Sequence, residues 1–243
     1  MTHPVLARAE RLVRVGDIVG AEAALVSLVE TEGDQALVLA LDDFPAKDLL
    51  AVLRDFDSAR ESVVNLLVSP EQFARAIVLE RRYGDISHER LHGMINSVIF
   101  RAGADPGEFL AAIAELEGGS EVLADYLHER AENLEHFFRS GVFDFFADGD
   151  DSLDDLTDDE RLDALSDENI GAPFLSHSEV SDHDWMELAW TLRYQQPEIF
   201  REVLLILRAR ARAEEQQQAA AATQAPAPAA RPAFGDPDEE SAL

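Results

Sequence analysis

Apolar residues recur at the spacing of an α-helix along most of this chain, and this pattern limits the possible folds more than any other feature. One stripe repeats at intervals of three and four residues and consists of Ala21, Ala24, Leu25, Leu28 and Val29. A helix buries such a stripe on one face. From Pro45 to about Glu80 the predicted helices are short and begin at Pro or at Ser-Pro, as at Ser69-Pro70. The sequence therefore predicts an all-α protein in which short, repeated helices stack on their neighbours in an α-solenoid-like arrangement.

The composition divides the chain into four segments. These are a helical-repeat domain at 1–143, an acidic linker at 144–170, a C-terminal helical segment at 171–215 and a tail at 216–243. The linker is expected to contain one short helix after Thr157, with Glu160 completing a capping box. The tail is rich in Ala, Gln and Pro, and such a composition cannot bury enough apolar surface to fold, so we expect it to be disordered.

Local signals make specific predictions about three later helices. Ser120 is expected to cap a helix that runs through a stripe of apolar residues to Gly141. Ser181 is expected to begin a second helix, which presents Trp185 to the core. Pro197 then opens the last predicted helix of the chain.

The charge of the chain narrows the range of partners. There are 20 Lys and Arg residues against 49 Asp and Glu residues, which gives a formal net charge of −29. Nucleic-acid binding depends on basic side chains that neutralise phosphates, so we expect no nucleic-acid partner. Protein partners with a basic surface, and cations, are the favoured alternatives.

The sequence also indicates where the protein acts. It has no cysteine, so disulfides and thiolate zinc sites are excluded. Its start has no apolar core of signal-peptide length, and its longest apolar runs are too short to span a bilayer. All basic residues except Lys47 are arginine, which is typical of a GC-rich bacterial genome. We therefore expect a bacterial, cytoplasmic protein without membrane insertion.

Two stretches resemble known helical families. The first, Leu37–Val78, contains Phe44-Pro45-Ala46-Lys47-Asp48-Leu49-Leu50 and Ser69-Pro70-Glu71-Gln72-Phe73. It resembles the helical repeats in the cytosolic N-terminal domain of bacterial magnesium transporters and in flagellar motor-switch proteins. The run from Ser69 to about Ile113 resembles a family of uncharacterised bacterial all-helical proteins. These resemblances cover under half of the chain and imply a helical fold with a docking role.

One motif points to metal chemistry. His88-Glu89-Arg90-Leu91-His92 matches the His-Glu-x-x-His pattern of zinc metalloproteases, in which the histidines bind zinc and the glutamate acts as general base. On a helical wheel the core stripe is centred near Leu91 and Ile95, so His88 lies on its flank and Glu89 points to solvent. A third ligand is not obvious, although the fold could bring in Glu108, Glu115 or Glu121. We prefer a helix-start signature and keep the zinc site as the alternative.

Two further clusters have a chemical and a structural interpretation. The first comprises His128, Glu132 and His136, each a helical turn apart. It offers two imidazoles and a carboxylate to a metal, or forms a solvated helix flank. The second is the acidic run Asp148–Asp154, which invites a calcium interpretation. An EF-hand loop needs Gly at its sixth position and Glu at its twelfth, where this chain has Leu153 and Asp159, so a solvated linker is favoured.

The functional hypotheses follow from these features. A basic patch of Arg208, Arg210 and Arg212 is expected near a helix end, where it complements the helix dipole or contacts an acidic partner. No motif singles out a catalytic constellation. The favoured function is a non-enzymatic cytoplasmic scaffold or adaptor that mediates protein–protein interaction. The alternatives are a zinc-dependent metallohydrolase that uses His88, Glu89 and His92, and a regulatory module that responds to divalent cations, by analogy with the transporter domain.

Overall fold

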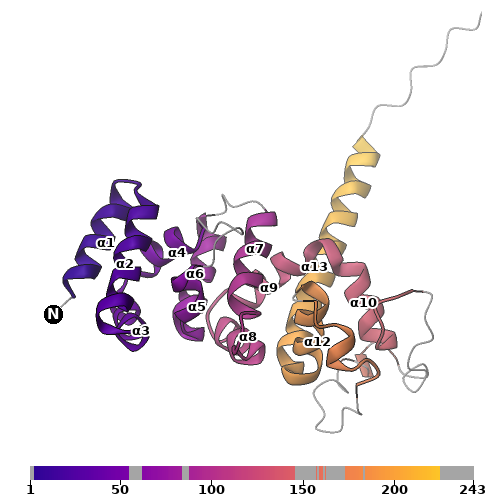
Figure 1. The fold of residues 1–243 in the computed structure, drawn as a ribbon. Helices are drawn as coiled ribbons and strands as arrows, with labels where there is room; N and C mark the ends of the chain where they lie inside the picture. The colour runs from indigo at the N-terminus through magenta and orange to yellow at the C-terminus, as the bar shows by residue number, and fades with distance from the viewer. Residues whose placement is uncertain are drawn as a thin grey trace, which may run out of the picture. The chain divides into compact units, whose positions relative to one another are not determined.

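The computed structural model describes residues 3–54, 62–83, 88–145, 157, 159–160, 162, 173–182 and 184–224. Every regular element in these ranges is a helix, which confirms the all-α prediction for the described part of the chain (Figure 1). No helix within those ranges is both long enough and apolar enough to cross a membrane. The chain divides into two compact units, Met1–Leu207 and Arg208–Leu243.

The first unit begins with a helical hairpin made of α1 (Pro4–Arg14) and α2 (Ile18–Glu32), which pack against each other. Gly16 lies between them with a φ of +81°, a backbone conformation that favours glycine. Asp17 then caps α2, because its carboxylate accepts a hydrogen bond from the amide of Gly20 at 2.9 Å.

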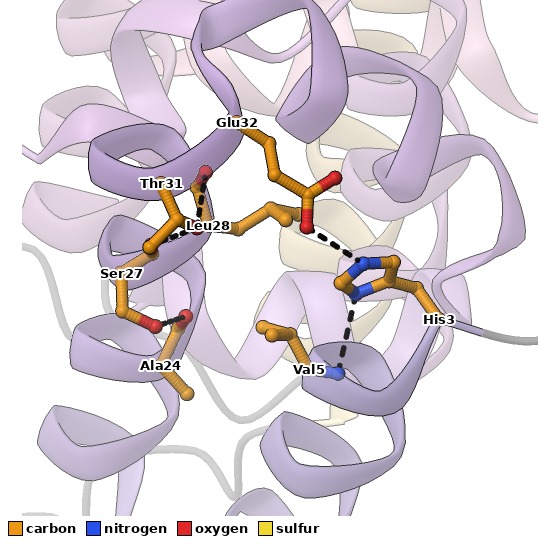
Figure 2. Close-up of polar contacts among 7 residues, drawn as sticks. All are labelled: His3, Val5, Ala24, Ser27, Leu28, Thr31 and Glu32. Carbon is orange, nitrogen blue, oxygen red and sulfur yellow. Dashed lines mark hydrogen bonds and ion pairs between the residues drawn. The ribbon is translucent and has the colours of Figure 1, made fainter.

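His3 joins the two ends of this hairpin. Its Nδ1 accepts a hydrogen bond from the amide of Val5 at 3.3 Å, so its proton lies on Nε2. Nε2 is 3.2 Å from the carboxylate of Glu32 and donates to it (Figure 2). The ring therefore links the start of α1 to the end of α2, a role that the sequence analysis did not assign to it.

Four short helices follow in the sequence. They are α3 (Asp34–Asp43), α4 (Ala46–Arg54), α5 (Val63–Leu67) and α6 (Pro70–Tyr83). Ser69 and Gln72 form a capping box, with each side chain accepting a hydrogen bond from the other residue's amide, at 3.3 and 2.9 Å. Gln72 is 1% exposed, and its Nε2 also donates to the carbonyl of Val38 and to the carboxylate of Asp42. The cap of α6 therefore also holds α6 against α3.

The middle of the unit continues with short helices that pack on near neighbours in the sequence. They are α7 (His88–Ile99), α8 (Pro106–Ala114), α9 (Gly119–Leu127), the 3-10 turn η1 (His128–Arg130) and α10 (Ala131–Ser140). Helix α6 packs on both α4 and α8, and α7 contacts α5 and α9. Their apolar faces belong to one continuous core.

The prediction of a single helix that is capped by Ser120 and runs to Gly141 is wrong in two respects. Gly118, with a left-handed φ of +88°, precedes α9, so Ser120 lies inside the first turn and is buried instead of capping the helix. The chain also leaves the α-helix after Leu127. Arg130 has φ −113° and ψ 15°, outside the α-helical region, so the regular hydrogen bonding does not continue into α10.

The C-terminal elements of the unit are η3 (His177–Glu179), α12 (Trp185–Gln195) and α13 (Pro197–Gln224). Helix α12 packs on α8, and its Arg193, which is 5% exposed, donates a hydrogen bond to the carbonyl of Phe137. The described residues from 173 to 207 therefore belong to the same compact unit as the helices before residue 143.

Two expectations about α12 need correction. Asp184, not Ser181, caps the helix, since its carboxylate accepts from the amide of Met186 at 2.8 Å. Trp190 is the core tryptophan, at 8% exposed, and its Nε1 donates to the carbonyl of Leu175. Trp185 is only half-buried. The stretch Glu187–Arg193 is buried without interruption, so a helical wheel with one apolar face does not describe it.

The tail and the linker are described only in part. Helix α13 continues to Gln224, so residues 216–224 are helical and not part of a disordered tail, consistent with the high helix propensity of Ala and Gln. Residues 225–243 lie outside the described residues. Most of the linker does too, but the expected capping box is confirmed, with the Glu160 carboxylate accepting from the Thr157 amide at 2.8 Å.

Candidate functional site

The structure brings the two histidines of the His-Glu-x-x-His motif together at the start of α7, but not the glutamate. The ring centroids of His88 and His92 are 4.7 Å apart. The Nε2 of His92 is 2.7 Å from the carbonyl oxygen of Tyr126 on α9, so this nitrogen carries a proton and donates it. Glu89 is exposed, as the helical wheel predicts. Within the His92 ring only Nδ1 is left to bind a metal, and the motif's glutamate, Glu89, does not lie beside it.

A polar chain of three side chains, in which only Tyr126 is fully buried, explains the position of His92. Its ring stacks on the ring of Tyr126, with centroids 4.1 Å apart, and the Tyr126 hydroxyl donates to Oδ1 of Asn96 at 2.6 Å. Burial lowers the pKa of His92 and raises the pKa of the Tyr126 hydroxyl. Both side chains are therefore neutral near pH 7, and together they connect α7 to α9.

The described residues contain no group of three or more His, Asp or Glu side chains arranged to hold a metal ion. The carboxylate of Glu129 is near His88, but its Oε1 is 4.0 Å from Nε2. None of the three glutamates that we considered as a third ligand takes part in such a group. One of them, Glu115, lines a groove formed with α13.

The second histidine cluster does not lie along one regular helix. His128 belongs to the turn η1, whereas Glu132 and His136 belong to α10. Nε2 of His136 is 3.1 Å from the carbonyl oxygen of Asp144, and its ring stacks on Phe145. His136 thus holds the chain that leaves α10. The acidic run Asp148–Asp154 lies outside the described residues.

A groove between α8 and the start of α13 is a surface feature that the sequence did not predict. It has a volume of about 600 Å³ and is open to solvent. Its apolar lining consists of Ala111, Ala114, Ile199 and Leu205. Leu205 is 47% exposed, although it is a large apolar residue on a helix. A partner that covers Leu205 would therefore gain apolar contact without opening the core.

The polar lining of the groove is mainly acidic. Glu115, Glu198 and Glu202 contribute carboxylates, and Arg201 contributes a guanidinium. All three glutamates are exposed. Three negative charges against one positive charge favour a cationic partner.

Contacts between helices far apart in the sequence shape this groove. The buried hydroxyl of Ser120 donates to the carboxylate of Glu202 at 2.7 Å and so joins α9 to α13. Gly107 on α8 lies so close to the end of α12 that a Cβ there would be 2.7 Å from Oε1 of Gln195. The two walls of the groove are therefore held by the core of the first unit.

The second unit contains the basic patch. Arg208, Arg210 and Arg212 lie on α13, which continues to Gln224. These arginines are therefore not at a helix end, and the expected complementation of the helix dipole, which acts within the last turn, does not apply to them.

The sequence matches no protein-family model, and searches of curated proteins and of solved structures likewise returned no match.

Proposed function

We propose that this protein is a non-enzymatic helical scaffold or adaptor that binds protein through the groove between α8 and α13. The observation that carries the proposal is the pairing of an exposed Leu205 with three surrounding carboxylates. Helix-in-groove recognition uses an apolar face for affinity and a polar rim for specificity. The matching partner is a helix with small or aliphatic residues on one face and arginine or lysine beside them.

The use of the histidines supports a binding role over a catalytic one. In the described ranges, His92 bonds to the carbonyl of Tyr126 and His136 lies against the carbonyl of Asp144. His177 places its Nε2 3.1 Å from the carboxylate of Glu187, which is 3% exposed. These contacts join helices or hold loops. The proposal also places the scaffold in a bacterial cytoplasm, in keeping with a cysteine-free, strongly acidic sequence.

A capture experiment tests the docking function. The full chain, the groove variant Glu198→Lys and the control Glu30→Lys are immobilised and exposed to bacterial lysate at physiological salt. Glu30 is an exposed acid on α2, so the control makes the same charge change away from the groove. We expect a partner that is retained by the wild type and by Glu30→Lys but lost from Glu198→Lys. Equal capture by all three proteins, or none by any, contradicts the proposal.

A zinc-dependent hydrolase is the second candidate, supported by the approach of His88 and His92, and zinc retention by the purified chain tests it. The third, a divalent-cation-responsive module, requires the melting temperature to rise in millimolar magnesium or calcium, since a ligand that binds the folded state stabilises it.

A further inference from the structure

We propose that the helix that occupies this groove is α13 of a second copy, so that the protein forms an antiparallel homodimer. The inference rests on the docking function proposed above and names the partner at that site. The second unit of each copy would dock on the first unit of the other.

The charge distribution of the chain favours this occupant. The whole sequence has only 20 basic residues, and three of them, Arg208, Arg210 and Arg212, lie within five positions of α13. The groove on the first unit presents Glu115, Glu198 and Glu202. The groove calls for basic side chains on its occupant, and the segment 208–212 of α13 supplies three of them, although α13 as a whole has as many glutamates as arginines.

The register of the charges matches an antiparallel pairing. Glu198 and Arg212 are each seven positions from Leu205, on opposite sides of it. In two antiparallel copies of a helix that cross at Leu205, a residue seven positions before the crossing faces the residue seven positions after it in the other copy. Each Glu198 would therefore face an Arg212, and the two-fold symmetry makes the pair occur twice.

The small residues around the crossing permit the approach of two helices. Ala209 and Ala211 alternate with the arginines, and both are exposed. On the groove side, Ala111 and Ala114 of α8 line the same groove as Leu205. Small side chains let helix backbones come close, and the two Leu205 side chains would then cover each other at the axis.

The net charge of −29 opposes association, but mainly at long range. At physiological ionic strength, charges separated by more than about 8 Å are largely screened, whereas close pairs such as Glu198 with Arg212 are less affected. The dimer should therefore form at physiological salt and weaken when salt is removed.

Sedimentation equilibrium of the full chain provides the first test. We expect the wild type at about 100 µM to sediment with twice the 26.8 kDa mass of one chain, since a small dimer interface typically gives micromolar affinity. Glu198→Arg and Arg212→Glu should each weaken the dimer by about tenfold or more, because each places two like-charge pairs at the interface. The control Glu30→Arg should leave the dimer unchanged.

Mixing the two single variants gives the decisive result. In the mixed dimer, the arginine introduced at position 198 of one copy faces the glutamate introduced at position 212 of the other, and the unchanged Glu198 and Arg212 face each other. We expect the mixture to recover the dimer, and the double variant E198R/R212E to dimerise alone. Since recovery requires both single variants to be folded, misfolding cannot mimic this pattern.

Two outcomes overturn the homodimer. One is a monomeric wild type at this concentration. The other is a dimer that neither charge reversal weakens, which would place the interface elsewhere. The wild type could also be monomeric and still capture from lysate a partner that Glu198→Lys does not capture. That result would contradict the homodimer and support the docking function.

Discussion

The hydroxyl of Ser120 donates a 2.7 Å hydrogen bond to the carboxylate of Glu202 and joins α9 to α13 across 82 residues of sequence. The two partners differ in their surroundings. Ser120 is 3% exposed, whereas Glu202 is exposed and lines the groove. A buried hydroxyl without a partner is costly, so this bond positions Glu202 at the groove.

This asymmetry makes a prediction about two substitutions that remove the same bond. Ser120→Ala should lower the free energy of unfolding by about 1 kcal/mol, because Glu202 is left in water. Glu202→Ala should cost more, about 1–3 kcal/mol, because it leaves the Ser120 hydroxyl buried and unpaired. Urea denaturation of both variants at one protein concentration measures the difference. A larger loss for Ser120→Ala would contradict the assignment of Ser120 as the buried donor.

Gly119→Ala should destabilise the protein through a backbone collision. A Cβ at Gly119 would run into the carbonyl oxygen of Ile113, so α8 and α9 would have to move apart. We expect a loss of about 1–3 kcal/mol in the free energy of unfolding, as for other overpacked sites.

Gly93→Ala is the matched control for this substitution. Gly93 lies inside α7 and has no heavy atom within 4 Å of an added Cβ. Alanine there should stabilise the helix by about 0.5–1 kcal/mol. Equal effects of the two substitutions in chemical denaturation would show that α8 and α9 do not approach as closely as described.

The elements that the sequence predicted well depend on local interactions. The starts at Ser69 and Thr157 are confirmed because both partners of a capping box lie within one turn. The solvent exposure of Glu89 follows from helix geometry alone. The predictions that Ser120 caps a helix and that Trp185 is the core tryptophan are wrong. The buried residues are Ser120 and Trp190, and their hydrogen-bond partners, Glu202 and the Leu175 carbonyl, come from distant parts of the chain.

The candidate site was hidden from the sequence for the same reason. The groove combines residues of α8 with residues of α13, and the two sets are more than 80 positions apart in the sequence. The apolar spacing within either helix alone does not predict that they meet. The sequence predicts the basic patch of Arg208, Arg210 and Arg212, but the role of the patch depends on where the helix that carries it ends. The Ala- and Gln-rich composition from Gln216 onwards predicts a tail, whereas the residues up to Gln224 continue α13.

Zinc retention separates the scaffold from the hydrolase. Purified full chain is mixed with one equivalent of zinc, desalted and analysed for metal beside His92→Ala. We expect no more zinc on the wild type than on the variant, because Nε2 of His92 already donates to Tyr126 and Glu89 faces solvent. One zinc per chain that is lost in His92→Ala would favour the hydrolase.

The pH dependence of stability should report on His92. Burial disfavours its charged form and lowers its pKa below the usual 6.5, so the unfolded chain takes up this proton at a higher pH than the folded chain does. The contribution of neutral His92 is therefore present above about pH 6.5 and is lost as the pH falls towards the folded-state pKa.

His92→Gln isolates this contribution, because glutamine can still donate to the carbonyl of Tyr126 but does not titrate. We expect the gap in free energy of unfolding between wild type and variant to be constant above about pH 7 and to move against the wild type between about pH 6.5 and pH 5. Urea titrations across this range measure it. Gly93→Ala, a non-titrating change on the same helix, should keep the wild-type profile. A gap for His92→Gln that stays constant throughout would show that His92 keeps an ordinary pKa, and that its contact with Tyr126 does not exclude water.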